Sequence, residues 1–143
     1  MAFRVFLIGL LSLCACSRKD PSSEAARLER EFEQTLTGGV LAGKFQIGDR
    51  VSEDRYTISK ASKLQGDTWL IHSKIGKHDV SIPVPVTVKW AGDTPVIELT
   101  DAGIPGLGTF TARVLFYRGH YAGYWANSKG HGGQMWGKIE RLR

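Results

Sequence analysis

Four histidines are the side chains best suited to bind a metal ion or to transfer a proton near neutral pH: His72, His78, His120 and His131. Two histidines that share a metal commonly stand at the i, i+2 or i, i+4 spacing, which places both on one face of a strand or helix. No pair in this chain has either spacing. We therefore expect surface histidines and no metal site.

No residue pattern provides a nucleophile, a base and an orienting group together. The sequence lacks a Gly-x-Ser-x-Gly motif and a His-Glu-x-x-His motif. Acidic residues such as Asp49, Asp67 and Asp93 directly follow a glycine, and turn formation accounts for them. We therefore expect a protein that is not an enzyme and has no cofactor.

A glycine-dense segment at 126–133 carries two candidate binding residues, Lys129 and His131. A phosphate-binding loop leads into a helix N-terminus, whereas a strand pattern follows this segment. We interpret it as a hairpin turn at the mouth of a barrel, where loops often carry binding residues.

Three aromatic residues, Tyr117, Tyr124 and Trp136, are expected on the outer face of their strands. Exposed aromatic side chains often mark the surface that contacts a partner. We interpret them as a candidate interaction surface for an envelope protein or a glycan, and we expect most other aromatic residues to fill the core.

The two cysteines, Cys14 and Cys16, follow an uncharged run at 5–13 that begins after Arg4. This pattern is typical of a signal peptide, and the run is far shorter than the roughly 20 apolar residues that span a bilayer as a helix. Because both cysteines lie at this end, we expect no disulfide in the mature protein.

The segment Leu13-Cys14-Ala15-Cys16 resembles the lipobox of bacterial lipoproteins, with an aliphatic residue at position −3 and a small residue at −1. The resemblance implies that residues 1–15 are removed and that Cys16 receives a diacylglycerol, whose two chains give a stable anchor. The alternatives are acylation of Cys14, which would put bulky Leu13 at −1, and ordinary cleavage after Ala15.

A polar tether follows at 16–22. Ser17 differs from the aspartate that retains enteric lipoproteins in the inner membrane. The resemblance therefore favours the outer membrane in a host with two membranes, with the domain in the periplasm or outside the cell.

The formal charge of +5 falls to +4 when Arg4 is removed with the signal peptide. Basic and acidic residues are interspersed, which favours a solvated surface, with attraction to anionic envelope material as the alternative. Nucleic acid is a poor partner for an exported protein.

One amphipathic helix is predicted over 21–37. In dividing the chain into segments, we place the tether at 16–22 and the helix at 23–37. Asp20 suits the N-cap, Pro21 the first helical position and Gly38 the end. Leu28, Phe32 and Leu36 form one apolar stripe. We expect this stripe to pack against the following domain, with a spacer or coiled-coil partner surface as the alternative.

From Val40 onward the hydrophobic pattern alternates, with turn residues between the runs. It predicts eight strands, at 40–47, 54–62, 67–76, 79–90, 95–100, 109–118, 120–127 and 133–142. The expected inward residues include Leu41, Phe45, Ile47, Tyr56, Ile58, Trp69, Ile71, Ile75, Val80, Ile82, Val84, Val86, Val88, Trp90, Phe110, Ala112, Val114, Phe116, Tyr121 and Trp125. The fold class is therefore mainly β: an antiparallel up-and-down barrel over 39–143, with a β-sandwich as the alternative.

Two details of the strands carry further predictions. Glycines at 43, 123 and 137 lie within the first, seventh and eighth strands, which become neighbours if the barrel closes. Pro83 and Pro85 remove two donors from one edge of the fourth strand, so we expect this edge to be unpaired or bulged.

The glycine-rich meander with aromatic strands resembles small calycin barrels, the class that includes lipocalins and avidin-like proteins. Where lipocalins carry Gly-x-Trp near the first strand, this chain has Gly43-Lys44-Phe45. The bulky inward residues favour a filled interior and a non-enzymatic binding or interaction module. The alternative is a carrier of a small apolar ligand, which calls for a cavity of at least about 300 Å³. An enzyme is the least favoured hypothesis.

Overall fold

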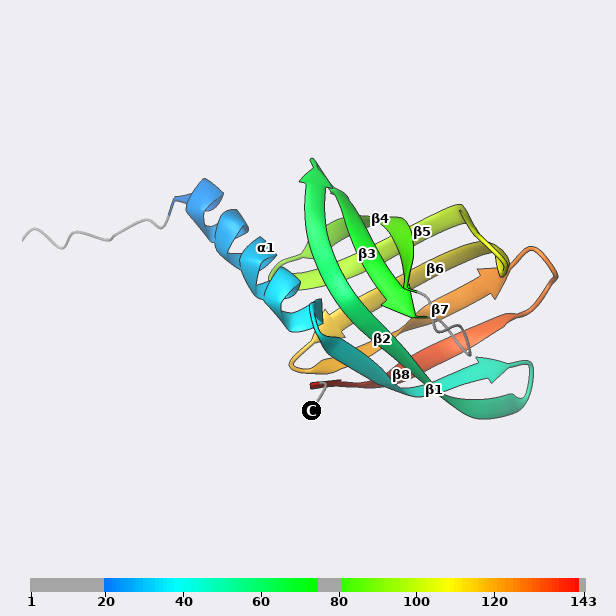
Figure 1. Cartoon of the computed structure of the whole chain (residues 1–143). Helices are drawn as coiled ribbons and strands as arrows, with labels where there is room; N and C mark the ends of the chain where they lie inside the picture. Colours follow the sequence, from blue (N-terminus) through cyan, green and yellow to red (C-terminus); the bar gives the residue numbers. More distant parts are fainter. Residues whose placement is uncertain (1–19, 75–80, 142–143) are drawn as a thin grey trace, which may run out of the picture.

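The computed structural model of the chain describes residues 20–74 and 81–141 (Figure 1). One helix precedes eight strands, which close into an antiparallel barrel in the order of the sequence. The predicted up-and-down barrel is confirmed, and the sandwich alternative is wrong. Cys16 and the predicted signal peptide lie outside the described residues.

The helix α1 spans Pro21–Leu36. The strands are β1 Gly39–Ile47, β2 Arg50–Gln65, β3 Thr68–Lys74, β4 Ile82–Ala91, β5 Thr94–Ile104, β6 Gly108–Tyr117, β7 His120–Asn127 and β8 Gly132–Arg141. Each corresponds to one predicted strand. The longest extension beyond a prediction is in β2, because its first half pairs with β1 and its second half with β3.

The helix begins at the expected residue and ends one residue before the predicted end, with Thr37 as its C-cap. The Asp20 carboxylate accepts the N–H of Ser22 at 3.0 Å, and Pro21 occupies the first turn. Gly38 follows the helix with a φ of +70°, a conformation that glycine adopts without strain. Residues 21 and 22, which we expected in the tether, belong to the helix, because capping by Asp20 starts the helix at Pro21.

The apolar stripe of α1 closes one end of the barrel, which we call the helix end. Leu36 is fully buried and Phe32 is 4% exposed. The Phe32 ring meets Trp69, Trp90 and Phe116 edge to face, with ring centroids 5.3, 6.0 and 5.7 Å away. The prediction that this stripe packs against the β-domain is confirmed.

Polar contacts hold α1 against one side of the rim, over β2. Thr37 Oγ1 accepts the N–H of Ala61 at 3.0 Å, and Gly38 donates its N–H to the Ile58 carbonyl at 2.9 Å. The Arg141 guanidinium donates to the Thr37 carbonyl at 2.8 Å. The helix is therefore fixed at its C-terminal end to both β2 and β8.

The barrel closes between β1 and β8 through paired glycines. Gly43 lies directly opposite Gly137. A Cβ atom on Gly43 would stand 2.1 Å from the Trp136 carbonyl oxygen, and one on Gly137 would stand 2.3 Å from the Ala42 carbonyl oxygen. The glycines therefore permit a backbone approach that a side chain would prevent. The prediction that the first, seventh and eighth strands are neighbours is confirmed.

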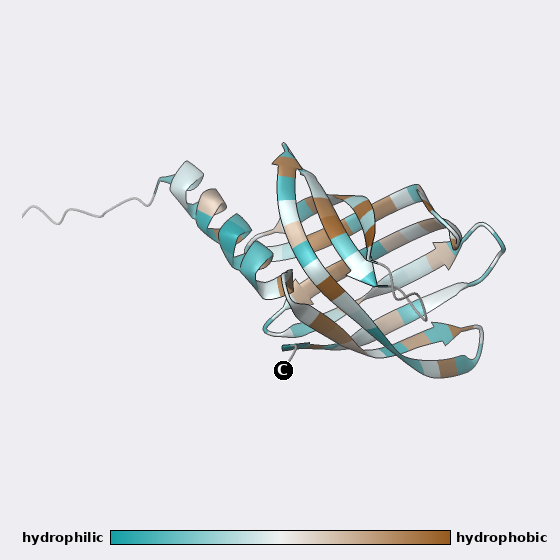
Figure 2. Ribbon diagram, viewed as in Figure 1, coloured by the Kyte–Doolittle hydropathy of each residue, from teal (hydrophilic) through white to brown (hydrophobic). Residues whose placement is uncertain are grey.

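The core consists of the inward residues of the strands together with the helix stripe. Figure 2 shows hydrophobic and hydrophilic residues alternating along β2 and β3. The predicted inward residues that are buried are Leu41, Ile58, Trp69, Ile71, Val84, Val86, Val88, Ala112, Val114, Phe116 and Tyr121. Ile75 and Val80 lie outside the described residues.

The edge of β4 that carries Pro83 and Pro85 has the predicted defect. On one side β4 pairs with β3 without interruption from Ile82 to Thr87. On the other side its described pairing with β5 covers only Thr87 to Ala91. The donors that the prolines lack therefore belong to the side facing β5, and the prediction of an unpaired edge is confirmed.

Candidate ligand-binding cavity

An apolar cavity of about 190 Å³ lies inside the barrel. None of its lining side chains carries a charge. They are Leu41, Tyr56, Ile58, Ile71, Ser73, Val84, Val86, Ile97, Leu99, Ile104, Leu107, Phe110, Ala112, Val114, Phe116, Trp125 and Met135. The bulky residues that favoured a filled interior therefore leave a cavity, which is smaller than the roughly 300 Å³ that we expected a carrier to need.

The cavity exists because the large inward side chains lie in two separate layers. Phe32, Trp69, Trp90 and Phe116 fill the helix end. At the opposite end, Trp125 contacts Phe45 and Phe110, with ring centroids 6.1 and 6.3 Å away. The strand positions between the layers carry mainly aliphatic residues, several of them small, such as Val84, Ala112 and Val114. These residues are too short to meet across the barrel.

Three polar groups lie in this apolar lining. Ser73 is the buried polar residue of the described core. Burial, together with the neighbouring Asp54 carboxylate, raises the pKa of the Tyr56 phenol, so Tyr56 stays neutral. The Trp125 Nε1 is enclosed without an acceptor among the described residues, which costs about 1–3 kcal/mol for a neutral donor.

The turn between β5 and β6 contributes two aliphatic residues to the cavity. Ile104 is buried and Leu107 packs against the core. The Leu107 N–H donates to the Ile104 carbonyl at 3.0 Å, which holds both in one tight turn. This turn accordingly covers part of the barrel end opposite α1.

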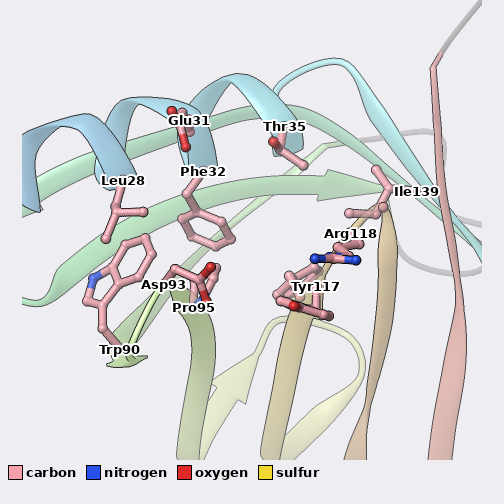
Figure 3. A pocket seen from close by; sticks show the side chains of 12 residues that line it. Leu28, Glu31, Phe32, Thr35, Trp90, Asp93, Pro95, Tyr117, Arg118 and Ile139 are labelled. Atoms are coloured by element: carbon pink, nitrogen blue, oxygen red, sulfur yellow. The ribbon is translucent and has the colours of Figure 1, made fainter. Parts of the chain in front are cut away.

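A second hollow, of about 300 Å³, lies between α1 and the rim of the helix end (Figure 3). Leu28 and Phe32 border it from the helix, with Trp90 below them, and Tyr117 and Arg118 border it from the β6–β7 turn. It forms because α1 is fixed over β2 and stands away from this side of the rim. Glu31, Asp93 and Arg118 also line it, so this hollow has a mixed polar and apolar lining, whereas the interior cavity is apolar.

The three aromatic residues predicted as an interaction surface are all exposed: Tyr117 to 46%, Tyr124 to 56% and Trp136 to 38%. Trp136 lies beside Ala122, which in turn lies beside Leu115, so an apolar row crosses β6, β7 and β8. Tyr124 is diagonal to Trp136. Tyr117 is separate from this pair, because it borders the hollow at the helix end.

The two loop candidates lie in an ordered turn. The Asn127 side-chain oxygen accepts the N–H groups of Lys129 and His131, both at 3.0 Å. Both side chains are exposed at the end of the barrel opposite α1. The predicted hairpin turn is confirmed, and neither residue lines the interior cavity.

Neither a metal site nor a membrane-spanning helix is found in the described part of the chain. Across residues 20–74 and 81–141, no three His, Cys, Asp or Glu side chains come close enough together to hold a metal ion. His120 uses its Nδ1 in a 3.0 Å contact with the Arg118 carbonyl oxygen, and His78 lies outside the described residues. No helix within the same ranges is both long enough and apolar enough to cross a membrane.

No family model matches the sequence, and neither a curated protein nor a solved structure matches the chain. The fold and the site together define an eight-stranded antiparallel barrel, closed at one end by a helix, with an uncharged cavity inside.

Proposed function

We propose that the barrel binds a small apolar molecule in its interior and that the protein is a non-enzymatic binding module. The observation that carries this proposal is the cavity of about 190 Å³, which no charged side chain lines. A dry apolar cavity of about 150 Å³ is large enough to bind benzene. The interior therefore suits a ligand portion of about seven or eight carbon atoms.

Native mass spectrometry of the protein isolated without detergent tests this proposal. We expect a discrete added mass, and we expect Ala112→Phe to remove it because the new ring occupies the cavity. Ala122→Phe is the matched control, because Ala122 is exposed on the outer face of β7. An apo mass for the unmodified protein, together with failure to take up added toluene, contradicts the proposal.

A second candidate function, interaction with an envelope component, is favoured by the exposed row of Leu115, Ala122 and Trp136. Cosedimentation with isolated peptidoglycan tests it. We expect the Tyr124→Ser, Trp136→Ser double variant to reduce binding about tenfold, since exposed aromatic residues commonly supply contact energy. The control is the Val51→Ser, Leu64→Ser double variant, which removes two other exposed apolar side chains. Equal binding by both variants contradicts this role.

For the localisation of the protein, we propose that Cys16 is acylated and attaches the protein to the cell envelope, with the outer membrane favoured where the host has one. The support is the lipobox-like segment 13–16. In the host, Cys16→Ser is expected to remove the diacylglycerol mass and to shift the protein from the membrane fraction to the soluble fraction. If Cys16→Ser keeps the acyl mass and stays in the membrane fraction, the assignment is wrong. Cys14→Ser, in contrast, should keep both the acyl mass and the membrane attachment.

A further inference from the structure

The barrel wall has a lateral gap between β4 and β5. Their described pairing stops at Thr87 and Glu98, about halfway along both strands. A cleft of about 230 Å³ begins at this pair and is bordered by Pro85–Thr87 of β4 on one side and by Glu98–Thr100 and Ala102 of β5 on the other. Because the remaining neighbouring strands stay paired around the barrel, this gap is a distinct feature of the described wall.

Neither edge of the gap is able to form a regular ladder. Pro83 and Pro85 offer no N–H groups to β5. On β5, a bulge interrupts the register after Leu99, and Asp101 adopts a φ of +49°. Prolines and bulges of this kind also prevent pairing with a strand from another molecule. The gap is therefore a poor site for an extended peptide.

Hydrogen bonds to β6 hold the bulge in place. The Asp101 N–H donates to Thr111 Oγ1 at 3.1 Å. The Arg113 guanidinium donates to the Leu99 carbonyl at 2.6 Å and to Thr100 Oγ1 at 2.9 Å. Because the edge of β5 is fixed from its other side, closing the gap would require these bonds to break.

The gap adjoins the interior cavity. Val86 and Leu99 line both the cavity and the cleft. The cavity alone is below the range of about 300–1,000 Å³ that is typical of ligand pockets. A molecule that extends from the cavity past Val86 and Leu99 would use the space of the cleft as well.

The lining of the cleft changes from apolar to polar toward the outside. Thr68, Thr87 and Thr100 supply hydroxyl groups, and Glu98 is the charged residue of the described lining. The nearest cation, Arg113, stands 3.5 Å from Glu98 and already donates to Leu99 and Thr100. An anionic group in the cleft would meet the Glu98 carboxylate, whereas a hydroxyl group would find several partners.

We propose that the lateral gap completes the ligand site and selects a single-chain amphiphile with a neutral, hydroxyl-bearing head. The hydrocarbon tail lies in the cavity and the head lies in the cleft beside the threonines. This inference rests on the proposed function, because it requires the interior to accept hydrocarbon. It goes further in naming the ligand class and the wall segment through which the ligand reaches solvent.

Calorimetric titrations with toluene, 1-octanol and octanoate test the gap separately from the cavity. Toluene fits within the cavity alone, so it reports on the proposed function. We expect Ala102→Trp, which fills the cleft, to weaken 1-octanol binding at least about tenfold and to leave toluene binding unchanged. Ala91→Trp, at an exposed position at the far end of β4, is the matched control, and both ligands should bind it as they bind the unmodified protein.

A second variant tests the selectivity for the head group without adding bulk. We expect Glu98→Gln to strengthen octanoate binding several-fold and to leave 1-octanol binding unchanged. If toluene binds but Ala102→Trp and Glu98→Gln alter neither octyl ligand, the gap has no role and this inference is wrong. If toluene itself fails to bind the unmodified protein, the proposed function fails, and the inference fails with it.

Discussion

The Phe32 ring of α1 lies edge-on to the Trp69 ring of β3, with 5.3 Å between their centroids. This contact joins the helix to the inward-facing residue at the start of β3, just inside the end of the barrel that α1 covers. It shows that α1 is part of the core and is not a spacer attached to a finished barrel.

Replacing Phe32 with Ala should therefore destabilise the barrel and not only the helix. We expect the free energy of unfolding to fall by about 3–5 kcal/mol, the range for removing a buried aromatic side chain. Urea denaturation measures this change. Leu64→Ala is the control at an exposed site, where the change should stay within about 0.5 kcal/mol. A similarly small effect at Phe32 would mean that the helix end is not packed as described.

The paired glycines at the barrel closure give a prediction with an internal control. Gly43→Ala should cost several kcal/mol, because the added Cβ would stand 2.1 Å from a backbone oxygen. Gly103→Ala should be neutral or slightly stabilising, since nothing lies within 4 Å of its added Cβ. Thermal unfolding compares the two variants, and equal losses would contradict the close approach of β1 and β8.

Amide hydrogen exchange should be faster along the lateral gap than in strands that are paired on both sides. We expect amides of β5 between Leu99 and Ile104 that face β4 to exchange faster than amides of β1 between Val40 and Phe45, which pairs on both sides. Exchange measured residue by residue by NMR distinguishes them. Uniform protection across both segments would argue that the gap closes in solution.

The partly buried phenol of Tyr56 should make the free energy of unfolding depend on pH in the alkaline range. Burial and Asp54 raise its pKa above the ordinary 10.0, so the folded protein holds this proton more tightly than the unfolded chain does. The resulting stabilisation is complete below pH 10 and is lost as the pH rises toward the folded-state pKa. Tyr56→Phe should flatten this decline in urea denaturation series, although Tyr121, whose pKa burial also raises, should leave part of it. An unchanged slope in Tyr56→Phe would contradict the assignment.

The sequence was sufficient to predict the strands, the helix stripe and the gap, because each depends on a local pattern. Alternation such as that from Ile82 to Trp90 identifies a strand, and Pro83 and Pro85 remove ladder donors whatever their partners are. The pairing of β1 with β8 was also within reach, since Gly43 and Gly137 carry the same signal.

The cavity could not be predicted, because it depends on how the strands are staggered. Trp69, Phe116 and Trp125 are all inward, and a pattern of alternation does not reveal that the first two share one level and the third another. The same limitation applies to Tyr117, which alternation places correctly on the outer face but which lies apart from Tyr124 and Trp136. Such relationships follow from register, and register is set by the whole barrel.

An NMR titration of the protein with toluene shows whether the interior accepts hydrocarbon. We expect saturable shifts of the methyl signals of Ile71, Val84 and Leu107, which line the cavity, with little change at exposed Val51 and Leu64. Ala112→Phe should abolish these shifts while leaving the protein folded. Shifts that never saturate, or that appear only at the exposed residues, would mean that the interior does not bind hydrocarbon.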